Sequence, residues 1–271
     1  EASGTISSSV TWCSVPSLSR GNVAQIHVIG NVTVASGATL TIKEGAIVKF
    51  WPGVSLTVYG TLNATNSFYG YGPITFTSNS PYSTWSGIVL NGTGANGSVL
   101  EYCVVERVET YGGSALTVIG ATGVTVRYST ISNNVNYATS GLAFYNAGSP
   151  DVFHNSITSN GGWGVEFNNT SGNVWANTIT SNFNGGVLCN SYSSPSFGKV
   201  GYYFGVGSGN NTITGGYWGV YANNRSSPYI GSQSTSSFGY NRITSTTTAR
   251  VYAGAFSNPL AEQNWWGSSS P

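Results

Sequence analysis

Charged residues are scarce in this chain of 271 residues. Asp, Glu, Lys and Arg make up 6% of it, against about 25% in typical globular domains. A protein that binds nucleic acid needs a basic surface to neutralise phosphates. With a net charge of +1 and no basic cluster, this chain is not expected to have a nucleic-acid partner. Disordered chains are usually charged and poor in aromatic residues; aromatic residues make up 13% of this chain, so disorder is not expected.

Acidic residues and metal-binding patterns are also scarce. Asp151 is the only aspartate in the sequence, whereas Ca²⁺ takes six to eight oxygen ligands, usually including several carboxylates. No two cysteines stand in a CxxC spacing, and no Cys/His cluster occurs. The sequence therefore predicts no metal site and no cofactor.

Long apolar segments and methionine are missing as well. No run of 18 apolar residues occurs, so no membrane span is expected. The chain begins at Glu1 and contains no Met. This fits a mature secreted protein whose signal peptide, with its initiating Met, has been removed, although a trimmed chain would look the same. We therefore expect a secreted protein, located outside the cell or at the cell surface.

What the sequence does contain is a short phrase that returns along the chain. Asn-Ser/Thr-Ile-Thr begins at Asn155, Asn177 and Asn211, and a weaker copy begins at Asn241. A Gly-Val pair, replaced by Arg-Val in the last copy, follows each phrase at nearly constant distance. Repeats of about 20–35 residues that read as strands are typical of a solenoid. No segment has the 3.6-residue apolar period of a helix.

Alignment of the repeats places apolar residues in three inward columns. Alternation of apolar and polar residues predicts strands with one buried face, and Asn at the bends predicts turns or stacked, hydrogen-bonded amides. At about 4.8 Å per rung, about nine coils would form a rod roughly 45 Å long. The first column is Phe76, Val105, Ile131, Ile157, Ile179, Ile213 and Ile243; the second is Ile88, Leu116, Leu142, Val165, Val187, Val220 and Val251; the third is Leu90, Val118, Phe144, Phe167, Cys189, Ala222 and Ala253.

The pattern divides the chain into three parts. Residues 1–24 are Ser-rich and are expected to be irregular, acting as a cap or as a strand for assembly with another subunit. Residues 25–267 are expected to form the solenoid, and residues 268–271 a tail. Two insertions that open with Ser-Pro-x-x-Gly, at Ser194 and Ser227, are expected to form lateral loops.

These features resemble the right-handed parallel β-helix superfamily, which includes pectate lyases and phage tailspikes. Residues 38–50 (ATLTIKEGAIVKF), 72–78 (GPITFTS) and 85–88 (WSGI) and the closing Asn-Trp-Trp-Gly from Asn264 are similar to secreted surface repeat-region domains. The resemblance covers roughly residues 25–267 and implies an all-β, right-handed solenoid of about nine coils. It implies little about function, because the superfamily hosts lyases, hydrolases, adhesins and inert stalks.

Catalytic chemistry has few candidate residues. The resemblance implies calcium held by several aspartates in the lyases and three aspartates in the polygalacturonases, and this chain has one. A glycosidase needs two carboxylates within about 5–10 Å of each other. If the chain is an enzyme, Glu106, Glu109 and Glu166 are the candidates; the competing interpretation is solvated surface carboxylates paired with Arg107 or Arg127. The sequence favours a protein without catalytic activity.

Four aromatic residues take matching outward positions, namely Trp163, Trp218, Tyr221 and Tyr252. Exposed aromatic rings can stack on sugars or pack against another protein, and they can equally lie beneath a lateral loop. They are the candidate binding residues.

Threonine pairs recur in the Thr-x-Thr pattern, at 178/180 and 212/214. Flat Thr ladders on β-helices resemble ice-binding faces, although Thr favours outward strand positions in any case. Ice binding is the third functional hypothesis.

For glycosylation and for disulfide formation, the sequence leaves more than one interpretation open. Asn-x-Ser/Thr triplets mark candidate glycosylation sites, but Asn, Ser and Thr are so common here that many arise by chance. The three cysteines, Cys13, Cys103 and Cys189, allow one disulfide and a free thiol, or three free thiols. The triplets begin at Asn31, Asn63, Asn91, Asn96, Asn168, Asn169, Asn210 and Asn224.

The scarcity of charge also bears on function, because a soluble monomer normally keeps a charged surface. The leading hypothesis is a non-catalytic extracellular structural protein, a subunit of a filament, surface layer or adhesin that associates with itself into a homopolymer. The alternative is a β-helix module that binds or acts on carbohydrate, with glycans as partners.

Overall fold

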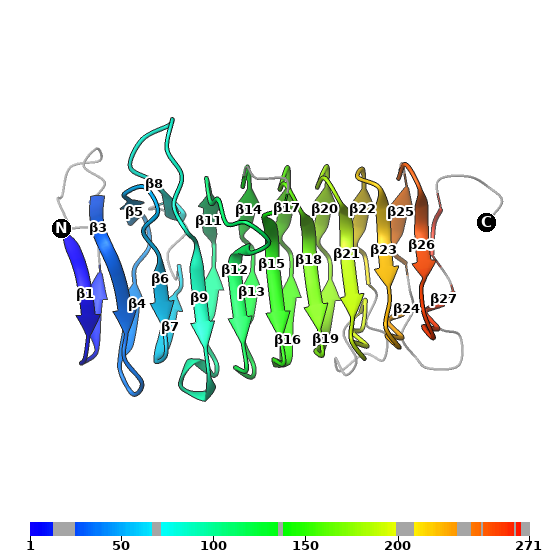
Figure 1. The fold of residues 1–271 in the computed structure, drawn as a ribbon, viewed down its shortest axis with the longest axis horizontal. Coiled ribbons are helices and arrows are strands. Elements are labelled where there is room, and N and C mark those ends of the chain that lie inside the picture. Colours follow the sequence, from blue (N-terminus) through cyan, green and yellow to red (C-terminus); the bar gives the residue numbers. More distant parts are fainter. Residues whose placement is uncertain are drawn as a thin grey trace.

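The structure is a computed structural model that describes residues 1–12, 25–66, 72–134, 138–198, 209–231, 240–244, 246–262 and 264–266. The strands wind into one elongated parallel β-solenoid of about 8 turns, close to the nine expected, with β1 (Ala2–Ile6) and β26 (Ala249–Ala253) toward opposite ends of the rod (Figure 1). In the described part of the chain the only helix is a 3₁₀ turn at Thr93–Ala95. The all-β solenoid is therefore confirmed, while its right-handed winding stays a prediction.

Each coil contributes up to three strands, which stack in three rows along the rod. The long strand β3 (Gln25–Val34) spans the first two rows, because its first half pairs with β5 and its second half with β6. The first row continues with β5 (Ile47–Phe50), β8 (Ile74–Ser78), β11 (Cys103–Glu106), β14 (Thr130–Ser132), β17 (Ser156–Thr158), β20 (Thr178–Thr180), β22 (Thr212–Thr214) and β25 (Arg242–Thr244). The second row contains β1 (Ala2–Ile6), β6 (Leu56–Val58), β9 (Ile88–Asn91), β12 (Ser114–Ile119), β15 (Ser140–Tyr145), β18 (Trp163–Asn168), β21 (Gly185–Asn190), β23 (Trp218–Ala222) and β26 (Ala249–Ala253). The third row contains β2 (Val10–Trp12), β4 (Thr39–Ile42), β7 (Thr61–Ala64), β10 (Val99–Glu101), β13 (Thr125–Arg127), β16 (Gly148–Phe153), β19 (Ser171–Trp175), β24 (Tyr229–Gly231) and β27 (Leu260–Ala261).

The predicted inward columns are confirmed by the strand register. Ile157 pairs with Ile179, Val165 with Val187, and Phe167 with Cys189, and the other members of each column pair in the same way. The first column is buried along its whole length. Apolar burial along the axis of the rod is therefore the main favourable term for the fold.

The asparagine phrase forms a buried hydrogen-bonded ladder. Asn177 Oδ1 accepts hydrogen bonds from the backbone N–H and Nδ2 of Asn155, and Asn211 Oδ1 does the same for Asn177. Asn241 and Asn264 continue the pattern toward the C-terminal end. Each amide thus satisfies backbone groups at a bend, where the buried chain has no strand partner for them.

A second ladder was not predicted. Asn134, Asn160 and Asn182 bond amide to amide at the bend between the first two rows, with distances of 2.7 and 2.8 Å. At the next bend Thr170, Ser193 and Ser226 receive backbone N–H groups through their hydroxyls. Two of the corners of the coil are therefore lined by amides and the third by hydroxyls.

A glycine column makes the bend into the second row possible. Gly164 and Gly186 each precede the inward valine of their strand. A Cβ on Gly164 would collide with Ile179 Cγ2 and lie 2.8 Å from the carbonyl oxygen of Gly186. The recurring Gly-Val pair is therefore a packing requirement, because two successive residues point inward at this corner.

Two predictions about organisation were wrong. Residues 2–6 and 10–12 are not irregular, since β1 pairs in parallel with β3 and β2 with β4; they add a rung to the rod. The openings of the two insertions are not loops either. Ser196 bridges Asn173 and Tyr229, and Phe197 is buried, so these segments continue the third row. Residues 13–24, 199–208 and 232–239 lie outside the described residues.

The closing aromatic pair covers the end of the first row, as expected. The backbone of Trp265 pairs with β25, the guanidinium of Arg242 lies 4.7 Å from the Trp265 ring centre, and Trp266 packs against the core. Ile243 beneath them is fully buried.

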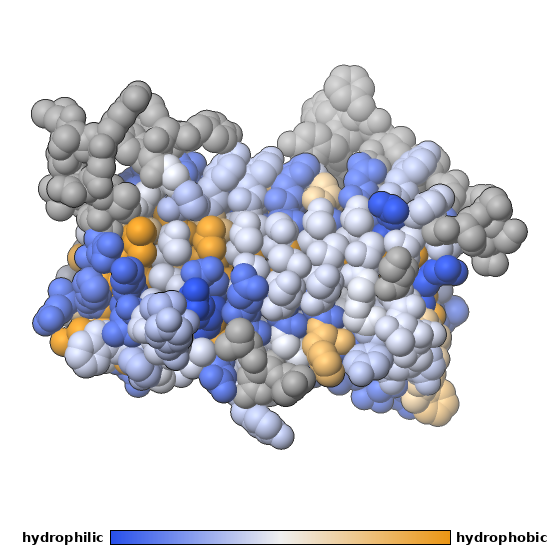
Figure 2. All heavy atoms as spheres, turned by 90° about the horizontal axis from the view of Figure 1, so that it is seen from above, coloured by the Kyte–Doolittle hydropathy of each residue, from blue (hydrophilic) through white to orange (hydrophobic). Residues whose placement is uncertain are grey.

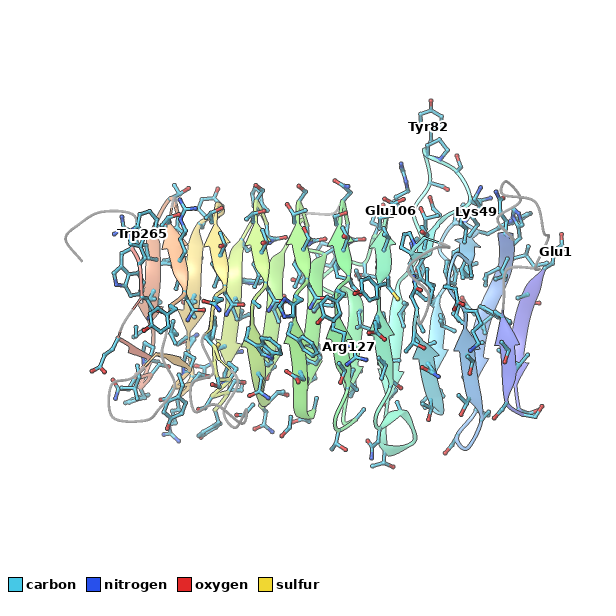
Figure 3. The ribbon with its side chains drawn as sticks, turned by 180° about the vertical axis from the view of Figure 1, so that it is seen from behind. Glu1, Lys49, Tyr82, Glu106, Arg127 and Trp265 are labelled. Carbon is cyan, nitrogen blue, oxygen red and sulfur yellow. The ribbon has the colours of Figure 1, made fainter. Side chains whose placement is uncertain are left out.

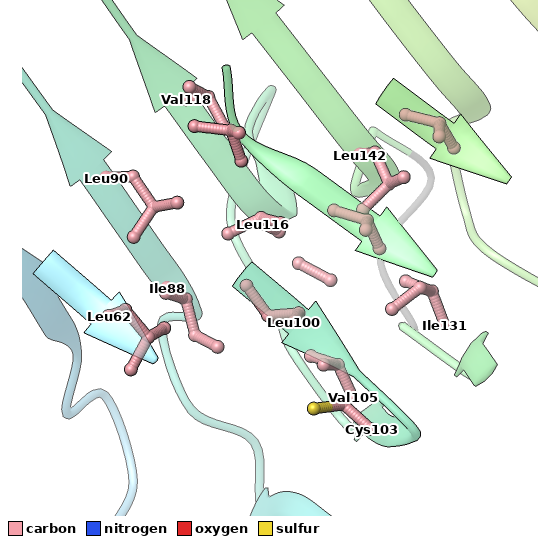
Figure 4. Close-up of a cluster of buried hydrophobic side chains, with 14 of the residues drawn as sticks. Leu62, Ile88, Leu90, Leu100, Cys103, Val105, Leu116, Val118, Ile131 and Leu142 are labelled. Carbon is pink, nitrogen blue, oxygen red and sulfur yellow. The ribbon is translucent and has the colours of Figure 1, made fainter. Parts of the chain in front are cut away.

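Two of the three cysteines are free thiols in the core, while Cys13 lies outside the described residues. Cys103 lies among apolar side chains (Figure 4), and Cys189 occupies the third inward column. Burial raises the pKa of both thiols far above the ordinary value. They are structural residues, and no disulfide joins them.

Candidate functional site

The four candidate aromatic residues come together on the outer face of the second row, and we call them the aromatic strip. The ring centres of Tyr221 and Tyr252 lie 4.7 Å apart, and Trp218 lies 5.0 Å from Tyr221 and 4.9 Å from Tyr252. Trp163, two rungs below, reaches to 5.9 Å from Tyr221. All four rings are half-buried or exposed, so the strip is an accessible surface and not part of the core.

A glycine between the two tryptophans explains how the strip forms. Gly185 pairs with Trp163 on one side and with Trp218 on the other. A Cβ on Gly185 would lie 2.7 Å from Trp163 Cζ3. The absence of a side chain therefore lets the Trp163 indole lie over the intervening rung and contact the tyrosine side of the strip.

Glu166 stands in the same outward column as the tyrosines, in the order Ala143, Glu166, Leu188, Tyr221 and Tyr252. The small side chain of Ala143 leaves room for the carboxylate, which accepts hydrogen bonds from Ser140 Oγ and from Tyr145. Ser140 Oγ in turn accepts the backbone N–H of Trp163 at 2.9 Å. The carboxylate is thus fixed in orientation by residues of the preceding rung, in the outward column that Tyr221 and Tyr252 continue.

Burial governs the acidity of this pair. It raises the pKa of Glu166, while the hydrogen bonds from Ser140 and Tyr145 oppose the shift. Burial, together with the nearby Glu166 carboxyl, raises the pKa of Tyr145 to about 12. Tyr145 is therefore a hydrogen-bond donor at neutral pH and unsuited to be a base.

Glu106 and Glu109 lie elsewhere. Glu106 is on β11 in the first row, near Lys49 and far along the rod from Trp265 (Figure 3). Its carboxylate accepts a hydrogen bond from Thr77 at 2.9 Å and lies 3.6 Å from Arg107. Glu109 accepts a hydrogen bond from Thr84 at 3.0 Å. The expected pairing with arginine is confirmed for Glu106, and Glu101 makes the pair with Arg127 at 3.0 Å.

Glycoside hydrolysis needs two carboxylates flanking one bond. The outward column of the strip carries Glu166 alone among the described residues. The described residues also hold no cluster of three metal-binding side chains.

Ser140 and Tyr145 were not predicted as site residues, although the alignment of the repeats fixes where both stand in their coil. Tyr145 stands opposite Asn168 in the register of β15 and β18, and Ser140 lies one position before the glycine of its own coil. Their hydrogen bonds to Glu166 depend on side-chain orientation between neighbouring rungs. The alternation of inward and outward residues along a strand does not predict that orientation.

A second outward surface consists of two hydroxyl columns on the first row. Thr158, Thr180 and Thr214 follow one another in register, and the neighbouring column contains Ser156, Thr178 and Thr212. Thr180 donates to or accepts from Thr158 across a rung, with the oxygens 3.2 Å apart. Arg242 interrupts the second column at β25.

The candidate glycosylation sites fall into two groups. Asn31, Asn96, Asn169, Asn210 and Asn224 are exposed, whereas Asn63, Asn91 and Asn168 are half-buried. Several exposed amides already make hydrogen bonds, such as Asn96 Oδ1 with the backbone of Thr122. Most of the described surface on the face shown in Figure 2 is weakly polar, with an apolar patch and a group of hydrophilic residues toward the left of the view.

Comparison with known families matches residues 104–268 to the family described as "Protein of unknown function (DUF1565)". That match covers more than half of the chain. The chain belongs to this family, which is of the parallel β-helix type. The matched part contains the whole aromatic strip, Glu166 and both ladders of asparagines.

Two further comparisons, with curated proteins and with solved structures, gave no match. Among the described residues no helix is long and apolar enough to cross a membrane.

Proposed function

We propose that this chain is a non-catalytic extracellular structural protein of the adhesin or surface-layer kind, and that its aromatic strip binds carbohydrate. The observation that carries the proposal is the meeting of four accessible aromatic rings and one oriented carboxylate on a single face. The leading structural hypothesis and its carbohydrate-binding alternative are thereby joined in one molecule.

The chemistry of the strip selects the class of ligand. Aromatic faces pack against the C–H faces of sugars, and a carboxylate accepts hydrogen bonds from sugar hydroxyls that are stronger than those of neutral acceptors. From Glu166 to Tyr252 the strip spans three rungs, roughly 14 Å at the usual strand spacing. A short neutral oligosaccharide fits this length.

An extracellular setting is supported by the surface of the rod. Charge is sparse, and five of the candidate glycosylation triplets are exposed. Attached sugars or neighbouring proteins would cover a surface that lacks the charge expected of a free soluble monomer.

The test is binding of neutral plant, algal and bacterial polysaccharides, measured by affinity electrophoresis and calorimetry. Trp163→Ala and Tyr252→Ala are each expected to weaken binding about tenfold, which is about 1.4 kcal/mol. Tyr82→Ala is the matched control, because Tyr82 is 97% exposed and stands on a loop away from the strip. Absence of binding across the panel, or equal loss in the control, would refute the proposal.

Ice binding is a second candidate, favoured by the two hydroxyl columns of the first row. It predicts thermal hysteresis that is lost in Thr180→Tyr and retained in Thr125→Tyr, which changes an outward residue of the third row. Freezing behaviour equal to that of an inert protein would end this candidate.

A further inference from the structure

Two side-chain amides border the aromatic strip on the outer face of the second row. We infer that Leu188 is the floor of a subsite for one sugar ring, and that Asn168 and Asn190 beside it select sugars with two adjacent free hydroxyl groups. This subsite rests on the proposed function, to which it adds two residues that determine specificity and a class of sugar.

The strand register places the amides in a column parallel to the strip. Asn168 follows Glu166 by two residues on β18, and Asn190 follows Leu188 by two residues on β21. Residues two apart on a strand point to the same face, and all four side chains are half-buried. Glu166 is in register with Leu188, and Asn168 with Asn190. The four positions therefore form a rectangle of about 4.8 Å along the rod and roughly 6.6 Å along the strands.

Leu188 provides the apolar side of this rectangle. Its neighbour on the next rung is Tyr221. The indole of Trp163 lies over Gly185, three residues before Leu188, and its ring centre is 5.9 Å from that of Tyr221. Apolar surface thus surrounds Leu188 on the side away from Asn190, and the C–H face of a sugar ring packs against surface of this kind.

The opposite side provides hydrogen-bonding groups. Two hydrogen bonds from residues of β15 hold the Glu166 carboxylate, which can accept about four. Asn190 Oδ1 accepts a hydrogen bond from Asn224 Nδ2 at 2.7 Å; this bond orients the amide and leaves Asn190 Nδ2 as a donor. The side chain of Asn168 makes no hydrogen bond to another residue in the described part of the chain. Three polar groups therefore face the space above Leu188.

The spacing of the amides determines which sugars fit. Asn168 and Asn190 are one rung apart, so each amide can reach one of two neighbouring hydroxyl groups on the same ring. A hydroxyl group both donates and accepts, as an amide does. A sugar that lacks one of the two hydroxyls forms one hydrogen bond fewer, which lowers affinity by about tenfold. The ligand class is a pyranose with a C–H face and adjacent free hydroxyls along one edge.

The subsite belongs to interior rungs of the rod. β18 is paired with β15 on the side away from β21, and β21 is paired with β23 on the side away from β18. Asn168 also begins a candidate glycosylation triplet. A glycan attached there would occupy the subsite, so the two uses of Asn168 exclude each other.

The experiment uses the full chain, produced in a host without N-glycosylation. The probes are the methyl glycosides of glucose, galactose and mannose, together with monodeoxy analogues that each lack one ring hydroxyl. Binding is followed by NMR, through the Leu188 methyl and Asn190 side-chain amide signals. At least one intact sugar is expected to shift both signals, and loss of one of its adjacent hydroxyls is expected to weaken binding about tenfold.

The variants assign this selectivity to the amides. In Asn168→Ala and in Asn190→Ala the preference for the intact sugar over its deoxy analogue is expected to fall to about twofold, because the partner of that hydroxyl is gone. Asn63→Ala is the matched control, since Asn63 is an outward, half-buried asparagine of the third row, and it is expected to behave like the wild type. Circular dichroism and thermal melting check folding. If Asn168→Ala does not fold, Asn168→Leu, which keeps the approximate shape, takes its place.

The outcomes separate the subsite from the proposed function. If Trp163→Ala weakens polysaccharide binding while Asn168→Ala and Asn190→Ala keep the full preference for the intact sugar, the subsite is wrong and the proposed function stands. Polysaccharide binding without any shift of the Leu188 and Asn190 signals by the three sugars also overturns the subsite alone. Failure of every polysaccharide to bind the wild type overturns both.

Discussion

The buried asparagine ladder offers a sharp test of what holds the coils in register. Asn177 is 1% exposed. Its Nδ2 donates to the carbonyl oxygens of Val152 and Trp175 at 2.9 and 3.0 Å, and its Oδ1 accepts the backbone N–H of Asn155 at 2.9 Å. The substitution Asn177→Ala removes all of these bonds.

The magnitude follows from the groups left without a partner. The N–H of Asn155 and the carbonyl of Val152 lose the amide that satisfies them, and each buried unsatisfied polar group costs about 1–3 kcal/mol. We therefore expect Asn177→Ala to lower the free energy of unfolding by about 4 kcal/mol, within the roughly 2–6 kcal/mol that two such groups allow.

The same bend provides its own graded comparison. In the equivalent position of an earlier coil, Ser129 Oγ accepts the N–H of Cys103 at 3.0 Å and donates to the carbonyl of Arg127 at 2.8 Å. A serine hydroxyl thus replaces part of the amide function. Asn177→Ser is expected to cost about half as much as Asn177→Ala, because the hydroxyl can accept the N–H of Asn155 while the carbonyl of Val152 stays without its partner.

The assay is equilibrium denaturation in guanidinium chloride, with hydrogen exchange at the Asn155 amide as a local readout. Asn190→Ala is the control, since Asn190 is half-buried and makes an exposed side-chain bond to Asn224; its cost is expected to be about 0.5 kcal/mol. Equal losses for Asn177→Ala and Asn190→Ala would refute the reasoning, as would unchanged exchange protection at Asn155. The denaturant slope must also be compared, because repeat arrays can unfold in parts.

Two other predictions rest on single residues. Gly164→Ala is expected to destabilise the fold by about 1–3 kcal/mol through overpacking, because its Cβ would collide with Ile179. Denaturation should show a smaller loss for alanine at Gly30, where φ is not in the left-handed region and the nearest atom to a Cβ is Ser3 Cβ at 3.3 Å. Glu166 has a pKa raised above its ordinary 4.5 by burial, so the stability it gives in its neutral form is present below pH 4.5 and declines as the pH rises through its folded-state pKa. Wild type should therefore lose stability relative to Glu166→Gln between acidic and neutral pH, and a difference that does not change with pH would contradict this assignment.

The repeating interior was predictable because each coil obeys the same constraint. Ile157, Ile179 and Ile213 must point to one axis, and the period of two along a strand fixes which neighbours point outward. Cys189 could be placed in an apolar column for the same reason. The place of Asn177 in a stacked ladder followed from its position at a bend. The second ladder, through Asn160 and Asn182, was not predicted, although both residues recur at the same distance after Asn155 and Asn177.

The N-terminal rung and the details of the site were not predictable in this way. Residues 2–6 form a strand because β3 presents an edge to them, and their own sequence, with Ser3 and Gly4, has little strand character. The aromatic strip depends on the absence of a side chain at Gly185 and on the orientations of rings that lie two rungs apart. The Glu166 contacts depend on the small size of Ala143, a property of a neighbouring coil 23 residues away in the chain.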